Sequence, residues 1–452
     1  MTARWSWIAA LLLLPSLMFA DVAPDWHAGF GPPPTGLGLD GDPRALLHHH
    51  DALYCGGSFS QAGSTTAWFA ARLDESFGAY SWTSIGDLDN RVDAMIAWGD
   101  SVLAGGRFTL ADGVVVNRVA VFDSTAWSPV GSPGAWTWGG VLSLTLHDGL
   151  PWAAGTDFVV RWTGSAWVDA VGAGFSGDVF ALASYDGDVF MAGAFSSVPN
   201  LSGDPTTAAN IARWDGAAWQ PVGSGLDGTG YAMTPWRDDL VVGGVFTSPA
   251  NKAARWNGTS WSALGSGLIG QYVTAIAGWG ARLIVGGDLS AAGGSTVSDV
   301  AIFDNAVWSD LGGGVDGMVR AISAKDGDVM VGGGFLMVGG STASSHLGLW
   351  IDPTVGVDQT PHSIPISNWP NPFNPSTTVL FAVDSAGPAH IAVYDLGGRI
   401  VRTLVDGHLD AGRHRIVWNG CGDDGRSLGS GSYLLRGSTL DGVGIRRLSL
   451  IR

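Results

Sequence analysis

The stretch VFALASYDGDVFMAGAF at residues 179–195, followed by IARWDGAAWQPV at 211–222, predicts one sheet of four short strands. Two apolar runs flank the turn signal Asp186-Gly187-Asp188, and Asp215-Gly216 separates two further runs. The mostly apolar first run suits a strand that is covered on both faces. The four expected strands are 179–183, 189–195, 211–214 and 218–222.

Tryptophan marks the last strand of this unit and returns along the chain at a steady interval. The markers are Trp26, Trp82, Trp127, Trp167, Trp219, Trp261 and Trp308. A second marker is a pair of small residues ahead of a hydrophobic one, at Gly56-Gly57, Gly105-Gly106, Ala154-Gly155, Ala192-Gly193, Gly243-Gly244, Gly286-Gly287 and Gly332-Gly333. Both series have seven members with a mean step of about 46–47 residues. A repeat of this length with several short strands per unit is typical of β-propellers.

The two ends of the repeat region complete each other. After Trp350 the chain leaves into Pro353 and lacks a fourth strand, whereas Trp26 precedes the first unit and has no unit of its own. We therefore predict an all-β fold in which residues 21–352 form a seven-bladed β-propeller. The N-terminal strand closes the last blade, and this pairing removes an open sheet edge.

Aromatic and small residues have predicted places in each blade. A third-strand aromatic and the fourth-strand tryptophan are five residues apart, as in Phe122 and Trp127, so a tight hairpin sets them on neighbouring strands to pack between blades. The small pairs fit positions where adjacent blades approach closely. The Gly-Gly pairs with two spaced aromatics resemble kelch-type propellers in architecture, although the spacing of the second aromatic departs from the kelch pattern. This resemblance carries no activity with it.

Composition and the N-terminus indicate an exported protein. Residues 1–20 have a positive start at Arg4, a short apolar core and a small residue at Ala20, which predicts a signal peptide. No later segment is long and apolar enough to be a transmembrane anchor. The net charge of −17 argues against nucleic-acid binding. The two cysteines, Cys55 and Cys421, are too few and too far apart for a disulfide framework.

Loop lengths divide the two faces of the predicted propeller. Connections from the second to the third strand are long and emerge on one face with the links between blades, and function on repeat scaffolds gathers where insertions collect. The candidate ligand-binding residues on this face are Asp112, Asn117, Asn200, Asp204, Asn251, Lys252, Asp299 and His346. No spacing singles out a catalytic pair or a metal site. Asp-Gly-Asp turns lack the ligand spacing of a Ca²⁺ loop, so we expect no cofactor.

A second domain follows a proline-containing linker at 353–367. Residues 368–452 predict a small β-sandwich with strands at 379–383, 390–395, 400–405, 413–418, 432–437 and 446–451. These residues resemble the Ig-like module of FlgD-type domains and of type IX secretion sorting domains. The motif residues are Trp369, Pro370, Asn371, Pro372, Phe373, Asn374, Pro375, Gly397, Gly398 and Tyr433. Trp369 replaces the tyrosine that is usual in the family.

The resemblance implies export across a bacterial outer membrane, with the secretion machinery as a partner. We expect a secreted or surface-exposed monomer. Its propeller would bind a glycan, peptide or surface polymer, and its C-terminal domain would sort or tether it. The alternatives are an exported hydrolase or lyase that acts on polysaccharide at the axial mouth of the propeller, and a spacer with no small ligand. Convergent acids or a metal at the axial mouth would favour the enzyme, whereas an aromatic and polar face would favour binding.

Overall fold

The computed structural model describes residues 25–76, 79–131, 139–172, 174–199, 205–325, 327–352, 366–383, 387–395, 399–410, 412–423, 425–439 and 442–452. All the secondary-structure elements within these residues are β-strands, which confirms the all-β prediction. The chain divides into two compact units, residues 1–353 and 354–452. The predicted signal peptide, residues 1–20, lies outside the described residues.

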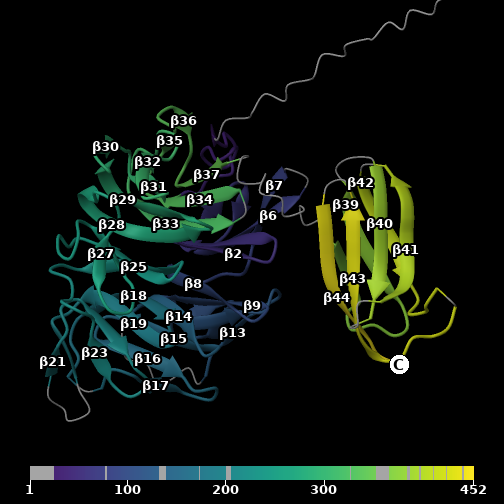
Figure 1. Ribbon diagram of the computed structural model, residues 1–452, viewed down its shortest axis with the longest axis horizontal. Helices are drawn as coiled ribbons and strands as arrows, with labels where there is room; N and C mark the ends of the chain where they lie inside the picture. The colour runs from purple at the N-terminus through teal and green to yellow at the C-terminus, as the bar shows by residue number, and fades with distance from the viewer. Residues whose placement is uncertain are drawn as a thin grey trace, which may run out of the picture. The chain divides into compact units, whose positions relative to one another are not determined.

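Seven antiparallel sheets make up most of the described part of the first unit (Figure 1). The first three are β2 (Pro43–His49), β3 (Ala52–Gly57), β6 (Ala70–Ser76) and β7 (Ala79–Ser84); β8 (Val92–Trp98), β9 (Ser101–Gly106), β12 (Val119–Phe122) and β13 (Trp127–Pro129); and β14 (Val141–His147), β15 (Leu150–Gly155), β16 (Phe158–Trp162) and β17 (Trp167–Asp169). The fourth and fifth are β18 (Asp178–Tyr185), β19 (Asp188–Ala194), β22 (Ile211–Trp214) and β23 (Trp219–Pro221); and β24 (Gly230–Trp236), β25 (Asp239–Gly244), β26 (Ala253–Trp256) and β27 (Trp261–Ala263).

The last two sheets and the loop hairpins complete the unit. The sixth sheet is β28 (Leu268–Trp279), β29 (Arg282–Ala292), β31 (Val300–Asp304) and β32 (Val307–Asp310), with β30 (Ser295–Thr296) paired to β29. The seventh is β33 (Val319–Lys325), β34 (Asp328–Gly333), β37 (Leu347–Ile351) and β1 (Asp25–Trp26). Short hairpins in the second-to-third connections are β4 (Gln61–Ala62) with β5 (Thr65–Thr66), β10 (Leu110–Ala111) with β11 (Val114–Val115), β20 (Ser197–Pro199) with β21 (Pro205–Thr207), and β35 (Met337–Val338) with β36 (Thr342–Ala343).

The four strands expected from residues 179–222 are confirmed as β18, β19, β22 and β23, with ends that shift by at most a few residues. The predicted aromatic pairing is confirmed as well. Trp214 lies directly opposite Trp219 in the register, with ring centroids 5.7 Å apart. Phe122 and Trp127 form the same pair in the second sheet at 5.2 Å.

The N-terminal strand belongs to the seventh sheet, as the sequence predicts. In the antiparallel register of β1 and β37, Trp26 lies opposite Trp350 and Asp25 lies opposite Ile351. First strands of successive sheets are neighbours from β2 through to β33, and β33 in turn lies beside β2. A buried cluster joins the last sheet to the first, with Met330 and Leu349 packed among side chains such as Leu53.

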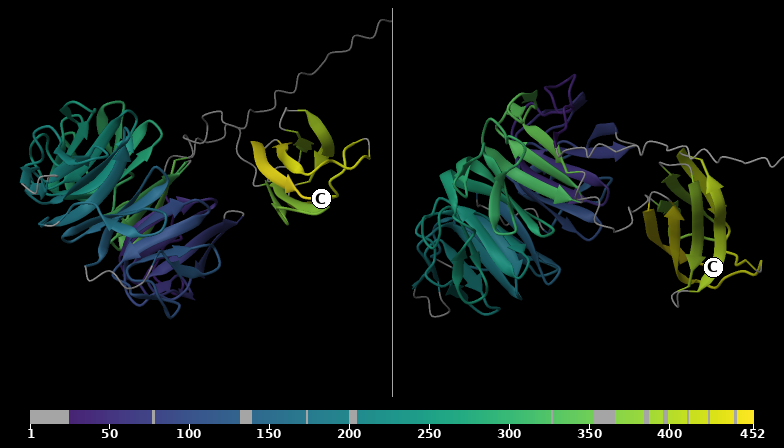
Figure 2. Two further views of the ribbon diagram at one scale, coloured as in Figure 1. Left: turned by 90° about the horizontal axis from the view of Figure 1, so that it is seen from below. Right: turned by 45° about the horizontal axis from the view of Figure 1, so that its top comes forward.

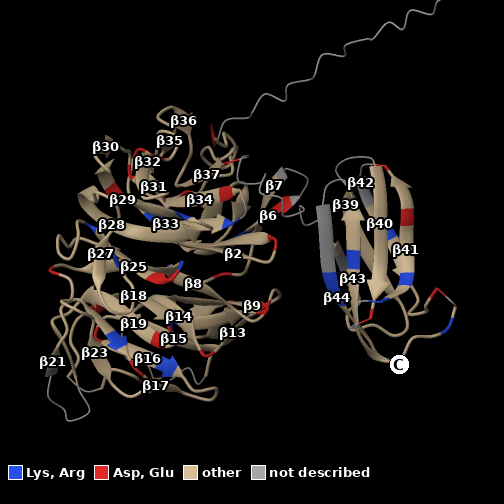
Figure 3. Ribbon diagram, viewed as in Figure 1, with Lys and Arg blue, Asp and Glu red and all other residues tan. Residues whose placement is uncertain are grey.

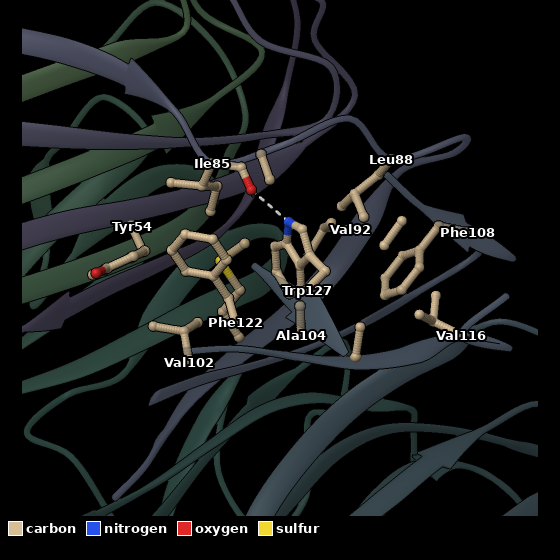
Figure 4. Close-up of a cluster of buried hydrophobic side chains, with 14 of the residues drawn as sticks. Tyr54, Ile85, Leu88, Val92, Val102, Ala104, Phe108, Val116, Phe122 and Trp127 are labelled. Carbon is tan, nitrogen blue, oxygen red and sulfur yellow. Dashed lines mark hydrogen bonds between the residues drawn. The ribbon is translucent and has the colours of Figure 1, made fainter. Parts of the chain in front are cut away.

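All seven marker tryptophans make an equivalent hydrogen bond. Each indole Nε1 donates to a backbone carbonyl in the connection that leads into the first strand of its own sheet, at donor–acceptor distances between 2.5 and 3.1 Å. Figure 4 shows one case, in which Trp127 points its nitrogen at the Ile85 carbonyl and packs beside Phe122. Trp26 makes the same bond to Gly312 and therefore has the role of a fourth-strand tryptophan in the seventh sheet.

The first residue of each small pair faces the next sheet. A Cβ on Gly56 would lie 2.6 Å from the Val92 side chain of the second sheet, so a larger residue there would push the sheets apart. Gly332 of the seventh sheet meets Pro43 of the first sheet in the same way, also at 2.6 Å. The sequence prediction for these pairs is confirmed, and the junction between the last and first sheets follows the pattern of the others.

One junction reverses this arrangement. Between the fourth and fifth sheets the second-strand residue is Ala192, and the first-strand residue that faces it is Gly230, where the first sheet has Pro43 and the other five sheets have valine; a Cβ on Gly230 would lie 2.8 Å from the Ala192 methyl. We expect Gly230→Val to lower the free energy of unfolding by about 1–3 kcal/mol through overpacking. Adding Ala192→Gly should recover most of this loss, because the double variant recreates the glycine–valine pair that is found at four other junctions. Urea denaturation of the four proteins in this cycle measures the coupling, and additive losses would contradict the assignment.

The second unit consists of two sheets (Figure 2). One sheet is β38 (Ile366–Trp369), β39 (Thr377–Val383) and β42 (Gly412–Trp418); the other is β41 (Ile400–Leu409), β40 (Gly387–Tyr394), β43 (Gly431–Thr439) and β44 (Gly442–Leu450). Both contribute to one buried core, which includes Phe381, Trp418 and Leu435. The six expected strands are present. The sequence did not predict β38, because Ile366 and Ser367 were assigned to the linker.

Candidate functional site

A cavity of about 570 Å³ lies where the first strands of the seven sheets begin, and every sheet contributes to its wall. We call it the axial cavity. Its lining residues are Arg44, Arg91, Asp93, Arg107, Leu142, Thr156, Asp178, Phe180, Tyr231, Tyr272, Thr274, Met318 and Arg320. Ligand pockets in proteins usually enclose about 300–1,000 Å³, so this volume suits a small ligand. Arg107 and Thr156 follow second strands, so the cavity lies at the end where the second-to-third connections emerge.

Strand alternation explains why these side chains face inward. In the second sheet Val92 is turned toward Gly56 of the preceding sheet, so its neighbours Arg91 and Asp93 are turned toward the cavity. Tyr272 and Thr274 flank Val273 in the same way in the sixth sheet. The residue after the buried partner of each small pair therefore faces the axis. The sequence contains this signal, because these residues stand at a fixed position in each repeat.

Arginine dominates the wall contributed by the seventh, first and second sheets. Arg91 Nε donates to the Asp93 carboxylate at 3.1 Å, and Arg44 Nη1 lies 3.8 Å from the other oxygen of the same group. Arg320 Nε donates to Asp42 at 2.9 Å. Burial raises the pKa of Asp93, whose side chain is only 5% exposed, although Arg91 and Arg44 act in the opposite direction.

Two guanidinium groups on this wall keep donors free. Arg44 Nε is buried and makes no hydrogen bond to any described residue. The Arg107 side chain is exposed, and within the described part of the chain it makes neither an ion pair nor a hydrogen bond. Its positive charge nevertheless acts to lower the pKa of Asp93. Burial, and after it the positive charge of Arg91, lowers the pKa of Arg44. Several cations are thus held close together with fewer anions to pair them.

Aromatic side chains form the opposite wall. Phe180, Tyr231 and Tyr272 come from the fourth, fifth and sixth sheets and are half-buried. Their ring centroids are 5.0 Å apart between Phe180 and Tyr231 and 6.2 Å apart between Tyr231 and Tyr272. The two tyrosine hydroxyls make no hydrogen bond to described residues. This arc therefore offers both apolar ring surface and polar groups to a ligand.

The carboxylates of the cavity are already engaged. Asp93 is paired with arginines, and an Asp178 oxygen accepts a 2.6 Å hydrogen bond from Thr156. Among the described residues there is no group of three or more His, Cys, Asp or Glu side chains placed to hold a metal ion. Within the described part of the wall the arrangement suits binding through cations and aromatic rings, rather than general acid–base chemistry by two free carboxyl groups.

The ligand-binding residues predicted from the sequence lie elsewhere. Asp112, Asn117, Asn251, Lys252, Asp299 and His346 belong to four different sheets, and none of them lines the axial cavity. Asn200 and Asp204 lie outside the described residues. The structure does not bring the six described residues together at one site. Their contact with a ligand stays a prediction.

Most of these six residues stabilise the loops in which they lie, through their backbone conformation or their hydrogen bonds. Lys252, Asp299 and His346 immediately precede third strands and have positive φ angles of 61°, 63° and 63°. Lys252 Nζ donates to the Val245 carbonyl at 3.1 Å, and Asp299 accepts from the Leu289 amide at 3.1 Å. Burial raises the pKa of Asp299.

His346 and the remaining three residues also make hydrogen bonds to nearby parts of the protein. The His346 ring nitrogen Nδ1 lies 3.0 Å from the Gly333 carbonyl and 3.3 Å from the Asp42 carboxylate, and the hydrogen bond with Asp42 raises its pKa. Asp112 accepts from the Asp87 amide at 2.8 Å. The Asn117 and Asn251 backbones take part in bonds within their loops.

A repeated aspartate clamp accounts for other acidic residues on this face. Asp227 accepts hydrogen bonds from the Thr247 and Ser248 amides and from the Thr247 hydroxyl, at 2.6–2.9 Å. These bonds, led by the one from Ser248, lower its pKa. Asp40, Asp89 and Asp316 likewise accept hydrogen bonds from the backbone amides of the residues 20 and 21 positions later in the chain. This spacing of 20 and 21 residues is visible in the sequence, and it assigns these carboxylates to the scaffold.

The residues predicted as a sorting motif bind the last strand of the second unit. The Asn371 amide group donates to the Arg447 carbonyl at 3.0 Å and accepts from the Ser449 amide at 2.8 Å. Phe373 is 2% exposed, packs 5.3 Å from Trp418, and pairs through its backbone with both neighbours of Leu450. Tyr433 donates to the Gly429 carbonyl at 2.8 Å.

The other motif residues make fewer contacts with the last strand. Trp369 ends β38, Pro370 is exposed, and the peptide bonds that precede Pro372 and Pro375 are cis. Gly397 and Gly398 lie outside the described residues.

Residues 374–441 match the FlgD Ig-like domain family. This match confirms the Ig-like assignment for most of the C-terminal unit, and the motif residues 369–373 precede it. No curated protein matches the chain. No helix among the described residues is long and apolar enough to cross a membrane.

Three solved structures resemble the chain at low identity. PorZ of Porphyromonas gingivalis, described as an essential bacterial surface component of the type-IX secretion system, is 13% identical, with a TM-score of 0.39 over 91% of this chain and 66% of that one. The extracellular domain of the putative hybrid two-component system BT4673 of B. thetaiotaomicron is 11% identical, with a TM-score of 0.48 over 96% and 60%. YjhT is 14% identical, with a TM-score of 0.38 over 58% and 95%. The chain spans less than two thirds of the length of the first two.

Proposed function

We propose that this chain is an exported bacterial surface or secreted protein whose first unit is a kelch-like, seven-bladed β-propeller that binds a ligand in its axial cavity. The ligand is a glycan, a peptide or a surface polymer. The proposal rests on one observation above all. All seven sheets contribute to one cavity, which has cations on one side and aromatic rings on the other.

Three features support the propeller assignment. The tryptophan hydrogen bond recurs seven times, the first strands are neighbours in cyclic order, and Gly332 packs on Pro43 as its counterparts pack on their neighbours. A chain built in this way has no free edge between its last and first sheets. The role of the C-terminal unit in sorting or tethering is part of the same proposal, supported by the FlgD Ig-like match and by the leader-like residues 1–20.

The competing function is an exported hydrolase or lyase that acts on polysaccharide. The hydrolase needs a carboxyl pair that is free to act on a substrate. The cavity carboxylates Asp93 and Asp178 are instead bonded to protein partners, which favours binding over hydrolysis.

Glycan and peptide arrays probed with the mature chain test the binding function. We expect retention of a defined set of ligands, and we expect Tyr231→Ala with Tyr272→Ala to weaken that retention at least about tenfold, because aromatic contacts dominate many binding sites. Trp68→Ala is the matched control, since this exposed tryptophan does not line the cavity. An unchanged binding profile in the double tyrosine variant would place the ligand elsewhere. Absence of any retained ligand would count against the binding function.

A further inference from the structure

We propose that the axial cavity recognises an acidic sugar. Its carboxylate lies between Arg44 and Arg107, and its ring lies against Phe180, Tyr231 and Tyr272. This inference rests on the proposed binding function and adds the chemical class of the ligand. It follows from the charge of the wall, from donors that lack partners, and from the aromatic arc that faces them.

The charge of the cavity is opposite to that of the protein. The chain carries a net charge of −17, and its basic residues are few and dispersed over the ribbon (Figure 3). Four guanidinium groups nevertheless line this one cavity, against the carboxylates of Asp93 and Asp178 and that of Asp42 behind Arg320. A concave site with a net positive charge within a negatively charged protein attracts anionic ligands. The cavity therefore selects for anions.

Unpartnered donors indicate where the anion sits. Arg44 Nε is buried without a hydrogen-bond partner among the described residues, and a buried donor in this state is destabilising until it is satisfied. Arg107 belongs to the neighbouring second sheet, and its guanidinium group makes no hydrogen bond or ion pair with the described residues. Arg91 and Arg320 donate hydrogen bonds to Asp93 and Asp42, whereas Arg44 makes only a longer ionic contact, 3.8 Å from Asp93. Because the planar fork of arginine matches a carboxylate, the first pair is the expected point of contact.

The aromatic wall determines what carries the carboxylate. Sheets four to six lie across the ring from sheets one and two, so Phe180, Tyr231 and Tyr272 face the arginines over a cavity of about 570 Å³. A pyranose acid has a carboxylate on one edge, an apolar C–H face and several hydroxyls. The ring faces can cover that apolar surface, and the tyrosine hydroxyls, which have no hydrogen-bond partner among the described residues, can bond the sugar hydroxyls. An acidic peptide offers the carboxylate without a rigid ring to match the arc.

Calorimetry of the mature chain with galacturonate oligosaccharides, uncharged galactose oligosaccharides and oligoglutamate tests this assignment. We expect binding to the uronates that weakens with added salt. Arg44→Gln and Arg107→Gln should each weaken it about tenfold or more, since a charge-assisted hydrogen bond is lost. Arg161→Gln removes the same charge from an exposed strand position outside the cavity and should leave binding unchanged. Thermal unfolding of each variant shows whether it is folded.

Each other outcome overturns a defined part of the account. Equal binding of uncharged and acidic oligosaccharides, unaffected by the arginine variants, would refute the acidic-sugar assignment and leave the binding function intact. Binding of oligoglutamate alone would refute the sugar. Binding of none of the three, together with an empty array, would refute the binding function itself.

Discussion

Replacing Trp26 by alanine should lower the free energy of unfolding of the first unit by about 3–5 kcal/mol, the usual cost of truncating a buried tryptophan. Trp26 is 5% exposed, lies opposite Trp350, and donates its indole hydrogen to the Gly312 carbonyl at 2.9 Å. Loss of the Trp26 side chain also weakens the pairing of β1, a strand of two residues, with the edge of the seventh sheet. Urea denaturation should show a lower midpoint with the slope of the wild type.

Trp68 provides a matched control for this experiment. Its side chain is 45% exposed, so Trp68→Ala should change stability by less than about 1 kcal/mol. Trp26→Phe should fall between the two, because it keeps an aromatic ring and loses the hydrogen bond. Equal stability of Trp26→Ala and Trp68→Ala would mean that the N-terminal strand does not contribute to the seventh sheet.

Delivery to the cell surface should be lost altogether when residues 368–452 are removed. The expectation follows from the proposed sorting role, and a shorter change tests it within the intact chain. Phe373→Ala removes a fully buried ring that packs on Trp418, at a cost of about 3–5 kcal/mol to the second unit. Loss of this packing frees the end of β44, so we expect the variant to accumulate in the periplasm of a host with type IX secretion.

Cell fractionation and surface proteolysis measure this outcome. Val417→Ala is the control, since Val417 belongs to the same unit and is 62% exposed on β42. It should be delivered as the wild type is. Retention of array binding by the periplasmic Phe373→Ala protein would show that its first unit remains folded. Unchanged surface delivery after deletion of 368–452 would refute the sorting role.

The repeat itself was predictable from the sequence because packing between sheets imposes residue types at fixed positions. A tryptophan must reach a carbonyl in the incoming connection, and a small residue must admit the next sheet, so both recur wherever a sheet recurs. The N-terminal strand could be placed for the same reason. Trp26 has the sequence surroundings of its counterparts, and the structure gives it the same hydrogen bond.

The candidate site was harder to predict, because loop length says where insertions gather and not where side chains converge. Lys252, Asp299 and His346 were predicted to bind a ligand because they are polar loop residues. Their shared structural feature is instead a left-handed backbone conformation at the end of each loop. The axial cavity depends on residues next to the buried first-strand residues that face the neighbouring sheet, such as Arg91 beside Val92, and their direction is fixed by alternation within a strand. Convergence of seven such positions becomes visible only when the sheets are assembled.

A crystal structure of residues 21–452 is the most direct test of the arrangement on which the site depends. We expect seven four-stranded sheets, with Trp26 Nε1 bonded to the Gly312 carbonyl and Gly332 packed against Pro43, around a cavity walled by Arg44, Arg107 and Tyr231. A different number of sheets, or a Trp26 strand unpaired with β37, would contradict the account.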